Sequence, residues 1–378
     1  MSSPLAAPAP DPLFEPLTIG DLELPSRLVM APMSRNRSVG ALPHRSAATY
    51  YAQRAGAGLI VSEGLAISAE GAGQFDIPGL WSEEQVAAWQ PIVSAVHEAG
   101  GRIFAQLWHL GRAGLTEHLP GGRRPVGPSA VAIDPTTYVA RRAQPYVEPV
   151  ALSVADIGEV AATYAAAARN ARAAGFDGVE LHGANGYLID QFLHASSNRR
   201  EDEYGGSFTN RARFLVEMTQ AVCEVWGPGR VGVRLSPSSS FQDMHDPDPS
   251  GLFTTALGLL DDLPLAYVHL VGPGISGAMS TAGAQVRSKL PEGAHPLDAR
   301  WARSRTTHRL IATGDYTAEL ARAALADGAA DAIGFARLYL ANPDLEARFR
   351  TGAPLNEPDR DTFYGGGDEG YIDYPALA

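Results

Sequence analysis

The sequence predicts an α/β protein built as a single (β/α)8 (TIM) barrel. Short apolar segments typical of buried strands alternate with helical segments, and this unit recurs eight times at roughly 40-residue spacing, as in such a barrel. Polar side chains gather directly after several predicted strands, which is where barrels carry their active sites. A length of 378 residues also fits one barrel with insertions. A doubly wound open sheet is the structural alternative, but it rarely needs so many units.

The elements are expected in the following order. Residues 1–12 are rich in Pro, Ala and Ser and predict a flexible tail, so the barrel domain spans 13–378. Residues 17–25 alternate around Gly20-Asp21 and predict a hairpin lid at the bottom of the barrel. The eight strands are expected at 27–32, 59–63, 102–107, 176–181, 230–235, 265–271, 309–312 and 332–335. Helices are expected at 44–55, from 82 to the Gly100-Gly101 stop, and at 156–174, 208–226, 253–263, 297–304 and 317–326. After the third strand, residues 112–150 form an excursion over the active-site face, because they are too long for an ordinary connection.

Composition excludes several classes of protein. The net charge of -12 and the lack of a Lys/Arg run argue against binding to nucleic acid. The one cysteine, Cys223, excludes an internal disulfide, a Cys-ligated iron–sulfur cluster and a Cys-rich zinc site, and we expect no metal. No segment resembles a signal peptide or reaches the roughly 20 apolar residues of a membrane span. We therefore expect a cytoplasmic protein, with a monomer and a homodimer both open.

The densest chemistry follows the fourth predicted strand. His182, Asn185 and Tyr187 come within one turn of chain after a short apolar segment, which would place them in a shared cavity at the barrel mouth. The alternative interpretation is a polar loop in which Asn185 only holds a turn. Glu180, inside the strand, is expected to be buried and paired with a neighbouring Arg.

A phosphate site is predicted after strands seven and eight. Gly314 lets the backbone approach an anion, and Arg337 adds a bidentate cation at the start of a helix, although a surface ion pair is an alternative explanation for Arg337. Polar groups at other strand ends suit a heterocycle with several carbonyls and ring nitrogens, which indicates a flavin pocket. These strand ends carry Ser34, Gly64, Gln106 and Arg234.

A set of longer motifs runs from about Leu13 to the C-terminus. They are Arg27-Leu-Val-Met-Ala-Pro-Met-Ser-Arg35, Gln106-Leu-Trp-His-Leu-Gly-Arg112, His182-Gly-Ala-Asn-Gly-Tyr-Leu188, Ser196-Ser-Asn-Arg199, Tyr204-Gly-Gly-Ser207, Asn210-Arg211, Ala341-Asn-Pro-Asp-Leu345, Phe363-Tyr-Gly-Gly-Gly367 and Glu369-Gly-Tyr371. With these motifs the chain resembles the Old Yellow Enzyme family of FMN-dependent ene-reductases, in particular the branch that includes N-ethylmaleimide, pentaerythritol tetranitrate and morphinone reductases.

This resemblance implies a function and a set of site residues. NADPH or NADH would reduce the bound FMN, and an electron-poor alkene would then accept the hydride. The residues implied to bind FMN are Pro32, Met33, Ser34, Gly64, Gln106, His182 and Arg234 around the ring, and Thr313, Gly314, Ala336 and Arg337 at the phosphate. His182 and Asn185 would hold the carbonyl or nitro oxygen of the substrate, and Tyr187 would protonate its α-carbon. Trp108 and Tyr364 would line the substrate cavity.

Five sites depart from the family pattern. Ser34 stands where many relatives have Thr or Cys, and Ala336 stands where Gly is usual. Asn185 stands where bacterial relatives often have a second His. Gln74-Phe75 falls where a Tyr often lines the cavity, and residues 272–277 lack an aromatic that some relatives place over the substrate, which predicts a more open pocket.

The predicted substrates are α,β-unsaturated carbonyls, maleimides and nitroalkenes, with nitrate esters or nitroaromatics as further candidates. Two other functions stay open at the level of sequence. One is a flavin-dependent dehydrogenase or oxidase on the same scaffold. The other is a flavin-free barrel lyase or isomerase that binds a phosphorylated substrate.

Overall fold

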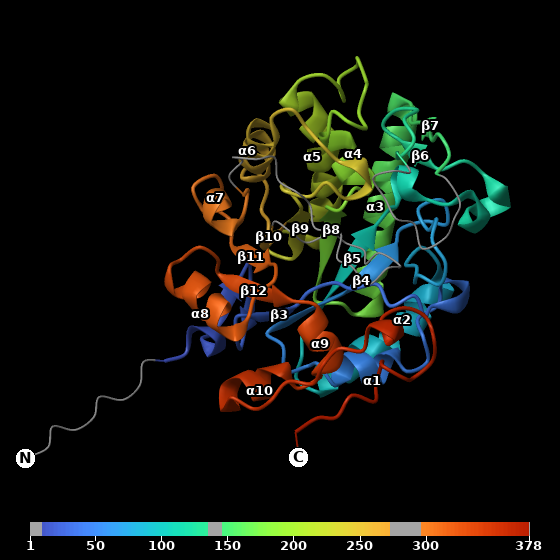
Figure 1. The fold of residues 1–378 in the computed structure, drawn as a ribbon. Helices are drawn as coiled ribbons and strands as arrows, with labels where there is room; N and C mark the ends of the chain where they lie inside the picture. The colour runs from blue at the N-terminus through green and yellow to red at the C-terminus, as the bar shows by residue number, and fades with distance from the viewer. Residues whose placement is uncertain (1–9, 135–145, 273–295, 378) are drawn as a thin grey trace, which may run out of the picture.

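Eight parallel strands form a closed barrel in a computed structural model that describes residues 10–134, 146–272 and 296–377 (Figure 1). The strands are β3 (Leu28–Met30), β4 (Leu59–Ala66), β5 (Ile103–Trp108), β8 (Gly178–Gly183), β9 (Val231–Leu235), β10 (Tyr267–Val271), β11 (Leu310–Thr313) and β12 (Ala332–Phe335). Each pairs with the next in chain order, and β12 closes the barrel on β3. The predicted fold is confirmed, with strand ends that differ by a few residues.

Helices surround the barrel. They are α1 (Ala47–Ala52), α2 (Glu83–Glu98), α3 (Val154–Ala174), α5 (Phe208–Trp226), α6 (Pro249–Leu260), α7 (Ala299–Arg303), α8 (Ala318–Ala326), α9 (Arg337–Ala341) and α10 (Leu345–Thr351). Helices α2, α3, α5, α6, α7 and α8 each begin after a residue whose side chain caps the first turn. Helix α2 has the expected capping box, in which Ser82 and Gln85 satisfy each other's backbone N–H groups. Helix α6 begins earlier than predicted, because Asp248 accepts a hydrogen bond from the N–H of Gly251 and Pro249 suits the first helical turn.

The hairpin of β1 (Leu17–Ile19) and β2 (Leu22–Leu24) closes the amino-terminal end of the barrel, as expected. Its turn residue Gly20 lies so close to Gly229 that a Cβ would approach the Gly229 carbonyl oxygen to 2.1 Å. Within the predicted tail, Asp11 caps the 3-10 helix Pro12–Phe14 and forms an ion pair with Arg322 at 2.8 Å. The rest of the predicted tail, residues 1–9, lies outside the described residues.

The excursion after β5 contains a pairing that the sequence did not reveal. Strands β6 (Val126–Gly127) and β7 (Val150–Ala151) pair in parallel and join the middle of the excursion to its C-terminal end. The buried guanidinium of Arg112 donates to the carbonyl oxygens of Val131 (3.0 Å) and Gln242 (3.1 Å), which joins the excursion to the loop after β9. Residues 135–145 of the excursion lie outside the described residues. So do residues 273–277, which belong to the segment that was expected to lack an aromatic over the substrate.

Helix α4 (Leu188–Leu193), directly after β8, was also not predicted. All six of its residues are buried, so it has no solvent-exposed face and gives no amphipathic period in the sequence. The helix sets the exit direction of the chain from β8, and it therefore matters for the site below.

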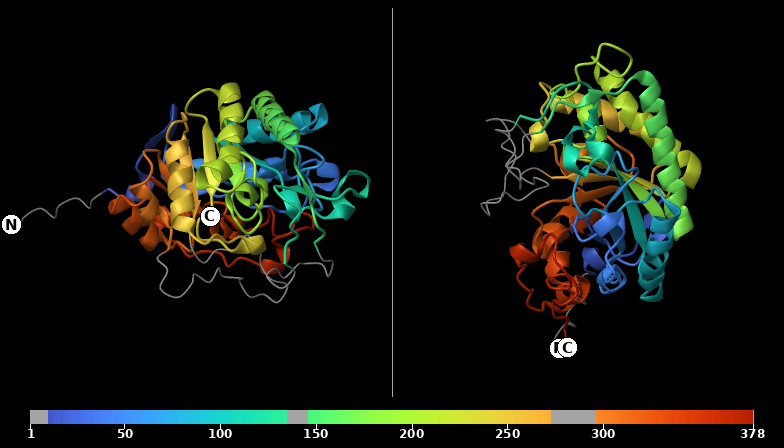
Figure 2. Two further views of the ribbon diagram at one scale, coloured as in Figure 1. Left: turned by 90° about the horizontal axis from the view of Figure 1, so that it is seen from above. Right: turned by 90° about the vertical axis from the view of Figure 1, so that its right-hand side faces the viewer.

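The C-terminal segment packs against the N-terminal quarter of the chain, as the red and blue ribbons show in Figure 2. The ring of Tyr371 stacks on Tyr50 of α1 with centroids 4.2 Å apart. The buried guanidinium of Arg35 donates to the carbonyl oxygens of Phe363 (2.9 Å) and Gly370 (2.8 Å). These contacts hold Tyr364 at the mouth of the barrel.

The acidic loop before α6 has structural roles. The side chain of Asp246 is buried, forms an ion pair with Arg211 at 2.8 Å and accepts the N–H of Ala195. In the part of the chain that the structure describes, no group of three or more His, Cys, Asp or Glu residues could hold a metal ion. No helix within the same residues is long and apolar enough to cross a membrane.

Candidate active site

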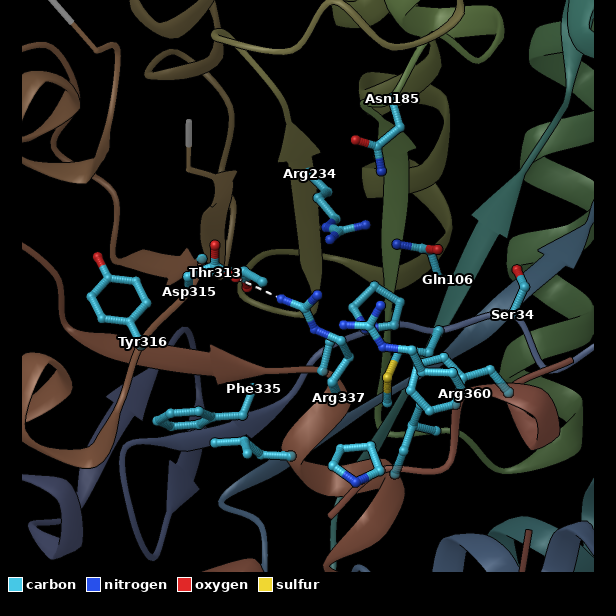
Figure 3. Close-up of a pocket in the computed structure, with 18 of the residues that line it drawn as sticks. Ser34, Gln106, Asn185, Arg234, Thr313, Asp315, Tyr316, Phe335, Arg337 and Arg360 are labelled. Atoms are coloured by element: carbon cyan, nitrogen blue, oxygen red, sulfur yellow. Dashed lines mark hydrogen bonds and ion pairs between the residues drawn. The ribbon is translucent and has the colours of Figure 1, made fainter. Parts of the chain in front are cut away.

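A cavity of about 780 Å³ opens at the carboxyl ends of the barrel strands. Such a volume is typical of pockets for drug-sized ligands and cofactors. Its lining includes every predicted site residue except Gly64. These are Pro32, Met33, Ser34, Gln106, Trp108, His182, Asn185, Tyr187, Arg234, Thr313, Gly314, Ala336, Arg337 and Tyr364. Figure 3 shows Gln106, Asn185 and Arg234 pointing into the cavity, with Thr313 and Arg337 toward its other end.

Gly64 is the exception, because it does not line the cavity. It lies in β4, and a Cβ there would approach the indole ring of Trp108 to 2.4 Å. Glycine at this position lets the Trp108 ring pack directly against the strand. The structure therefore gives Gly64 a role in placing a cavity wall.

The loop after β8 is held by hydrogen bonds beneath it. Asn185 has a left-handed backbone (φ 58°), a conformation that Asn tolerates better than most residues. Its N–H donates to the hydroxyl of Ser236 at 2.8 Å, and the N–H of Gly186 donates to Asp190 of α4 at 2.8 Å. The buried α4 thus anchors the turn from below. This turn aims the Asn185 amide into the cavity (Figure 3), so a turn-holding role and a ligand-facing side chain coexist.

Tyr187, the residue that precedes α4, is packed between two other site residues. Its ring meets the edge of Trp108 at a centroid distance of 4.7 Å and an interplanar angle of 82°. The ring of His182 lies 5.0 Å away. Edge-to-face packing of this kind fixes ring orientation. The phenol, the imidazole and the indole therefore form one wall of the cavity.

Burial sets the charge of this wall. Burial first, and then the electrostatic effects of the nearby Arg234 and His269, lower the pKa of His182 well below its ordinary value, so the imidazole is neutral at physiological pH. Burial also lowers the pKa of Arg234, but an arginine remains charged. The site therefore combines neutral donors at one end of β8 with a fixed cation on β9.

Four buried polar atoms of the site have no hydrogen-bond partner within the described residues. They are Nε1 of Trp108, Nδ1 of His182, Oδ1 of Asn185 and Nε of Arg234. Buried polar groups are normally paired, so a cluster of unpaired ones facing a cavity indicates a polar ligand. A flavin offers ring nitrogens and carbonyl oxygens to match them.

Glu180 is buried in β8 as predicted, but the expected Arg partner is wrong. Its carboxylate accepts hydrogen bonds from Gln106 (2.7 Å), from the hydroxyl of Tyr267 (3.1 Å) and from Nδ1 of His269 (2.8 Å). Tyr267 and His269 alternate along β10, so their shared inward face follows from the period of a strand. The sequence alone did not tell which neighbouring strand would supply the partner.

The other end of the cavity lies after β11 and β12. Thr313 and Gly314 line it from the first strand, and Ala336 and Arg337 from the second. Arg337 is partly exposed and pairs with Asp315 at 2.6 Å, so the ion pair weighed from the sequence does form (Figure 3). The same guanidinium still borders the cavity, together with Tyr316 and Arg360, which sequence reasoning missed. An amide, a hydroxyl and a guanidinium around the ring end, with a backbone turn and cations at the other, fit a flavin mononucleotide.

Comparisons with known proteins agree with this chemistry. Residues 12–356 match the NADH:flavin oxidoreductase / NADH oxidase family. The rice (Oryza sativa subsp. japonica) 12-oxophytodienoate reductase 1 is 42% identical over 376 residues, which cover 99% of this chain and 95% of that protein.

Solved structures are similar over the same extent. Morphinone reductase in complex with tetrahydroNAD is 43% identical, with a TM-score of 0.87 over 97% of this chain and 98% of that one. The old yellow enzyme homologue from Zymomonas mobilis is 41% identical, with a TM-score of 0.87 over 97% and 99% of the two chains. The chain therefore belongs to the NADH:flavin oxidoreductase / NADH oxidase family and is an FMN-dependent oxidoreductase of the Old Yellow Enzyme type.

Proposed function

We propose that this protein uses NADH or NADPH to reduce the C=C bond of electron-poor alkenes such as enones, maleimides and nitroalkenes. The observation that carries the proposal is that His182, Asn185 and Tyr187 line the same cavity as Gln106 and Arg234. A non-catalytic flavin-binding protein has no need for two neutral donors and a phenol in one cavity.

His182 and Asn185 hold the oxygen that conjugates with the alkene. Hydride addition at the β-carbon turns this group into an enolate or nitronate, and the negative charge grows on the held oxygen. Fixed donors in a buried site stabilise such a charge, and the loss of one typically costs about 3 to 4 kcal/mol of barrier. Because burial keeps His182 neutral, its grip does not depend on a proton taken from solvent.

Tyr187 supplies the proton at the α-carbon. A phenol has an ordinary pKa of about 10, so it is protonated at neutral pH and acidic enough to protonate an enolate. The packing of its ring against Trp108 and His182 keeps the hydroxyl in one place relative to the held oxygen. Proton transfer can therefore follow hydride transfer without a rearrangement of the wall.

Gln106 and Arg234, with Ser34, would hold the FMN ring, and Thr313, Gly314, Ala336 and Arg337 its phosphate. FMN, when bound, supplies the hydride that it takes from the nicotinamide nucleotide. The morphinone reductase structure contains a nicotinamide analogue, tetrahydroNAD, which supports the same class of reductant here. Arg234 places a fixed positive charge in the cavity, which favours a ligand that becomes negative on reduction.

Product analysis tests the proposal. An anaerobic reaction with 2-cyclohexenone and either nucleotide should yield the saturated ketone. Reduction of the carbonyl to the allylic alcohol, or no turnover with enones, maleimides and nitroalkenes alike, would contradict the proposed chemistry.

A further inference from the structure

Glu180 is a buried carboxylate that the proposed reaction does not use. It lies in β8, has no exposed surface, and directs both of its oxygens at polar side chains inside the barrel. Oε1 accepts from Nε2 of Gln106 at 2.7 Å, while Oε2 accepts from Tyr267 and His269. One of these partners, Gln106, lines the cavity.

The charge of Glu180 determines which way the Gln106 amide faces. Burial alone would raise the pKa of Glu180, but His269, Arg234 and the Gln106 hydrogen bond outweigh it and hold the pKa below its ordinary value. An ionised carboxylate has acceptors only. It therefore attracts the NH₂ end of the Gln106 amide and repels the oxygen end, so the amide cannot flip at low cost.

The fixed amide presents a defined edge to the cavity. Its Nε2 carries a second N–H beside the one given to Glu180, so an acceptor and a donor remain for a ligand. The pyrimidine ring of a flavin has the complementary edge, an N–H next to a carbonyl. A flipped amide would lose this match because its oxygen would point at the carboxylate.

Glu180 also places a negative charge near Arg234. The two residues lie on adjacent strands, where Glu180 is paired with Gly232 and His182 with Arg234 in the β8–β9 register. The carboxylate partly offsets the field of the arginine cation. Removing it would leave the cavity more positive and would favour the reduced, more negative form of a bound flavin.

We propose that Glu180 is a positioning residue for the cofactor: it fixes the orientation of the Gln106 amide and tempers the positive charge of Arg234. The inference rests on the proposed FMN site around Gln106 and Arg234. It concerns cofactor affinity and potential, and no role in proton transfer is assigned to Glu180.

A double-mutant cycle on FMN affinity tests whether Glu180 acts on the cofactor through Gln106. Glu180→Gln keeps the size of the side chain but removes its charge and its acceptor-only character. The Kd of FMN, measured by flavin fluorescence on apo-protein prepared from the holoenzyme, should rise about tenfold in this variant. In a Gln106→Ala background the same change should alter Kd less than twofold, because the group through which Glu180 acts is gone. Equal weakening in both backgrounds would overturn the positioning role.

Tyr267→Phe is the matched control. It removes another hydrogen bond to Glu180, at the oxygen that does not contact Gln106. FMN affinity should then stay within about twofold of wild type. If Tyr267→Phe weakened FMN binding as much as Glu180→Gln, the loss of any hydrogen bond to Glu180 would have this effect. That result would overturn a specific action of Glu180 through Gln106.

The midpoint potential of bound FMN is a second measurement. A general structural defect would not shift this potential in a predictable direction. In Glu180→Gln, the ratio of Kd for oxidised to reduced FMN should rise about tenfold, which is a positive shift of about 30 mV for a two-electron couple. Glu180→Asp, which keeps the charge but withdraws it from Gln106, should weaken FMN binding without this shift. It also serves as the test if Glu180→Gln does not fold.

An unchanged or lower potential in Glu180→Gln, or unchanged FMN affinity in Glu180→Asp, would overturn the inference. Reoxidation of wild-type enzyme by 2-cyclohexenone, measured on the same preparations, tests the proposed function separately. The inference can thus fail while the proposed function stands.

Discussion

Tyr187 is the residue whose role separates the two halves of the proposed reaction. Tyr187→Phe keeps the ring that packs on Trp108 and His182 and removes only the hydroxyl. Reduction by the nucleotide should stay within about twofold of wild type, whereas reoxidation by 2-cyclohexenone should slow at least about 100-fold, since general acid catalysis is worth this much. Stopped-flow absorbance of each half-reaction measures both. Equal losses in the two half-reactions would contradict the role of Tyr187 as the proton donor.

Asn185 offers a matched pair of substitutions. Asp and His both tolerate its left-handed backbone (φ 58°), but an aspartate replaces the donor by a negative charge and a histidine keeps a donor. We expect Asn185→Asp to lower kcat/KM for enones by about 100- to 1000-fold, as for the loss of an oxyanion donor, and Asn185→His to stay within about tenfold. Steady-state kinetics at equal flavin content check this. A similar loss in both variants would indicate that activity depends on the turn conformation of Asn185 and not on its hydrogen-bond donor.

For single residues, the sequence predicted which side chains form the site better than it predicted their hydrogen-bond partners. His182, Asn185 and Tyr187 are close in sequence, so one loop brings them together and the motif was sufficient. Glu180 contacts Gln106, Tyr267 and His269 on two other strands, and such contacts depend on barrel register. Register is a long-range property, which explains why an arginine partner was expected and a histidine, a tyrosine and a glutamine were found.

Among the elements, the C-terminal segment depends on one buried arginine. Arg35 donates to three backbone carbonyls of the segment, and its guanidinium lies 5.1 Å from the ring centroids of Tyr50 and Tyr371. Lysine cannot reproduce this planar fork. Arg35→Lys should therefore lower the free energy of unfolding by about 2 to 4 kcal/mol, since hydrogen bonds to a charged group are lost in a buried site.

Urea denaturation at fixed FMN concentration measures this effect. Arg45→Lys is the control, because Arg45 is largely exposed and pairs with Asp368 at 3.5 Å, and an exposed pair contributes little. If the two substitutions had equal effects, the segment would not depend on the Arg35 hydrogen bonds.

The elements that the sequence missed share a physical cause. Helix α4 is buried on all sides, and strands β6 and β7 are two residues each, so neither shows a period that can be recognised. The longer helices were predicted because one face is apolar and the ends carry caps, as at Ser82 of α2. The site depends on α4, so the part hardest to predict is the part that aims Asn185.

For the whole molecule, the pH dependence of stability provides a test of the buried interior. Burial raises the pKa of Glu63 to about 7 from its ordinary 4.5, despite the N–H of Arg35 that its carboxylate accepts at 3.2 Å. Between these values the folded state binds more protons than the unfolded state, so Glu63 makes the free energy of unfolding fall as the pH rises. The shift corresponds to roughly 3 kcal/mol.

Glu63→Gln removes this titration. The unfolding free energy of the variant minus that of wild type should therefore increase by roughly 3 kcal/mol between about pH 4.5 and pH 8. Urea denaturation of both proteins across this range measures the difference. Parallel curves would show that Glu63 stays ionised in the fold.

The barrel as a whole was predictable because its signal repeats. Eight strand–helix units agree with one another, and an error at one strand end does not change the architecture. What the repeat does not encode is how the excursion and the C-terminal segment pack on it, since the buried guanidinium groups of Arg112 and Arg35 act on distant backbone carbonyls.

The most direct test of the central claim is an anaerobic absorption spectrum of the purified protein, recorded alone, after NADPH or NADH, and then after 2-cyclohexenone. The proposed function predicts flavin bands that bleach with the nucleotide and return with the enone. Bands that bleach and do not return with the enone, or that never bleach with either nucleotide, would contradict reduction of electron-poor alkenes by this protein.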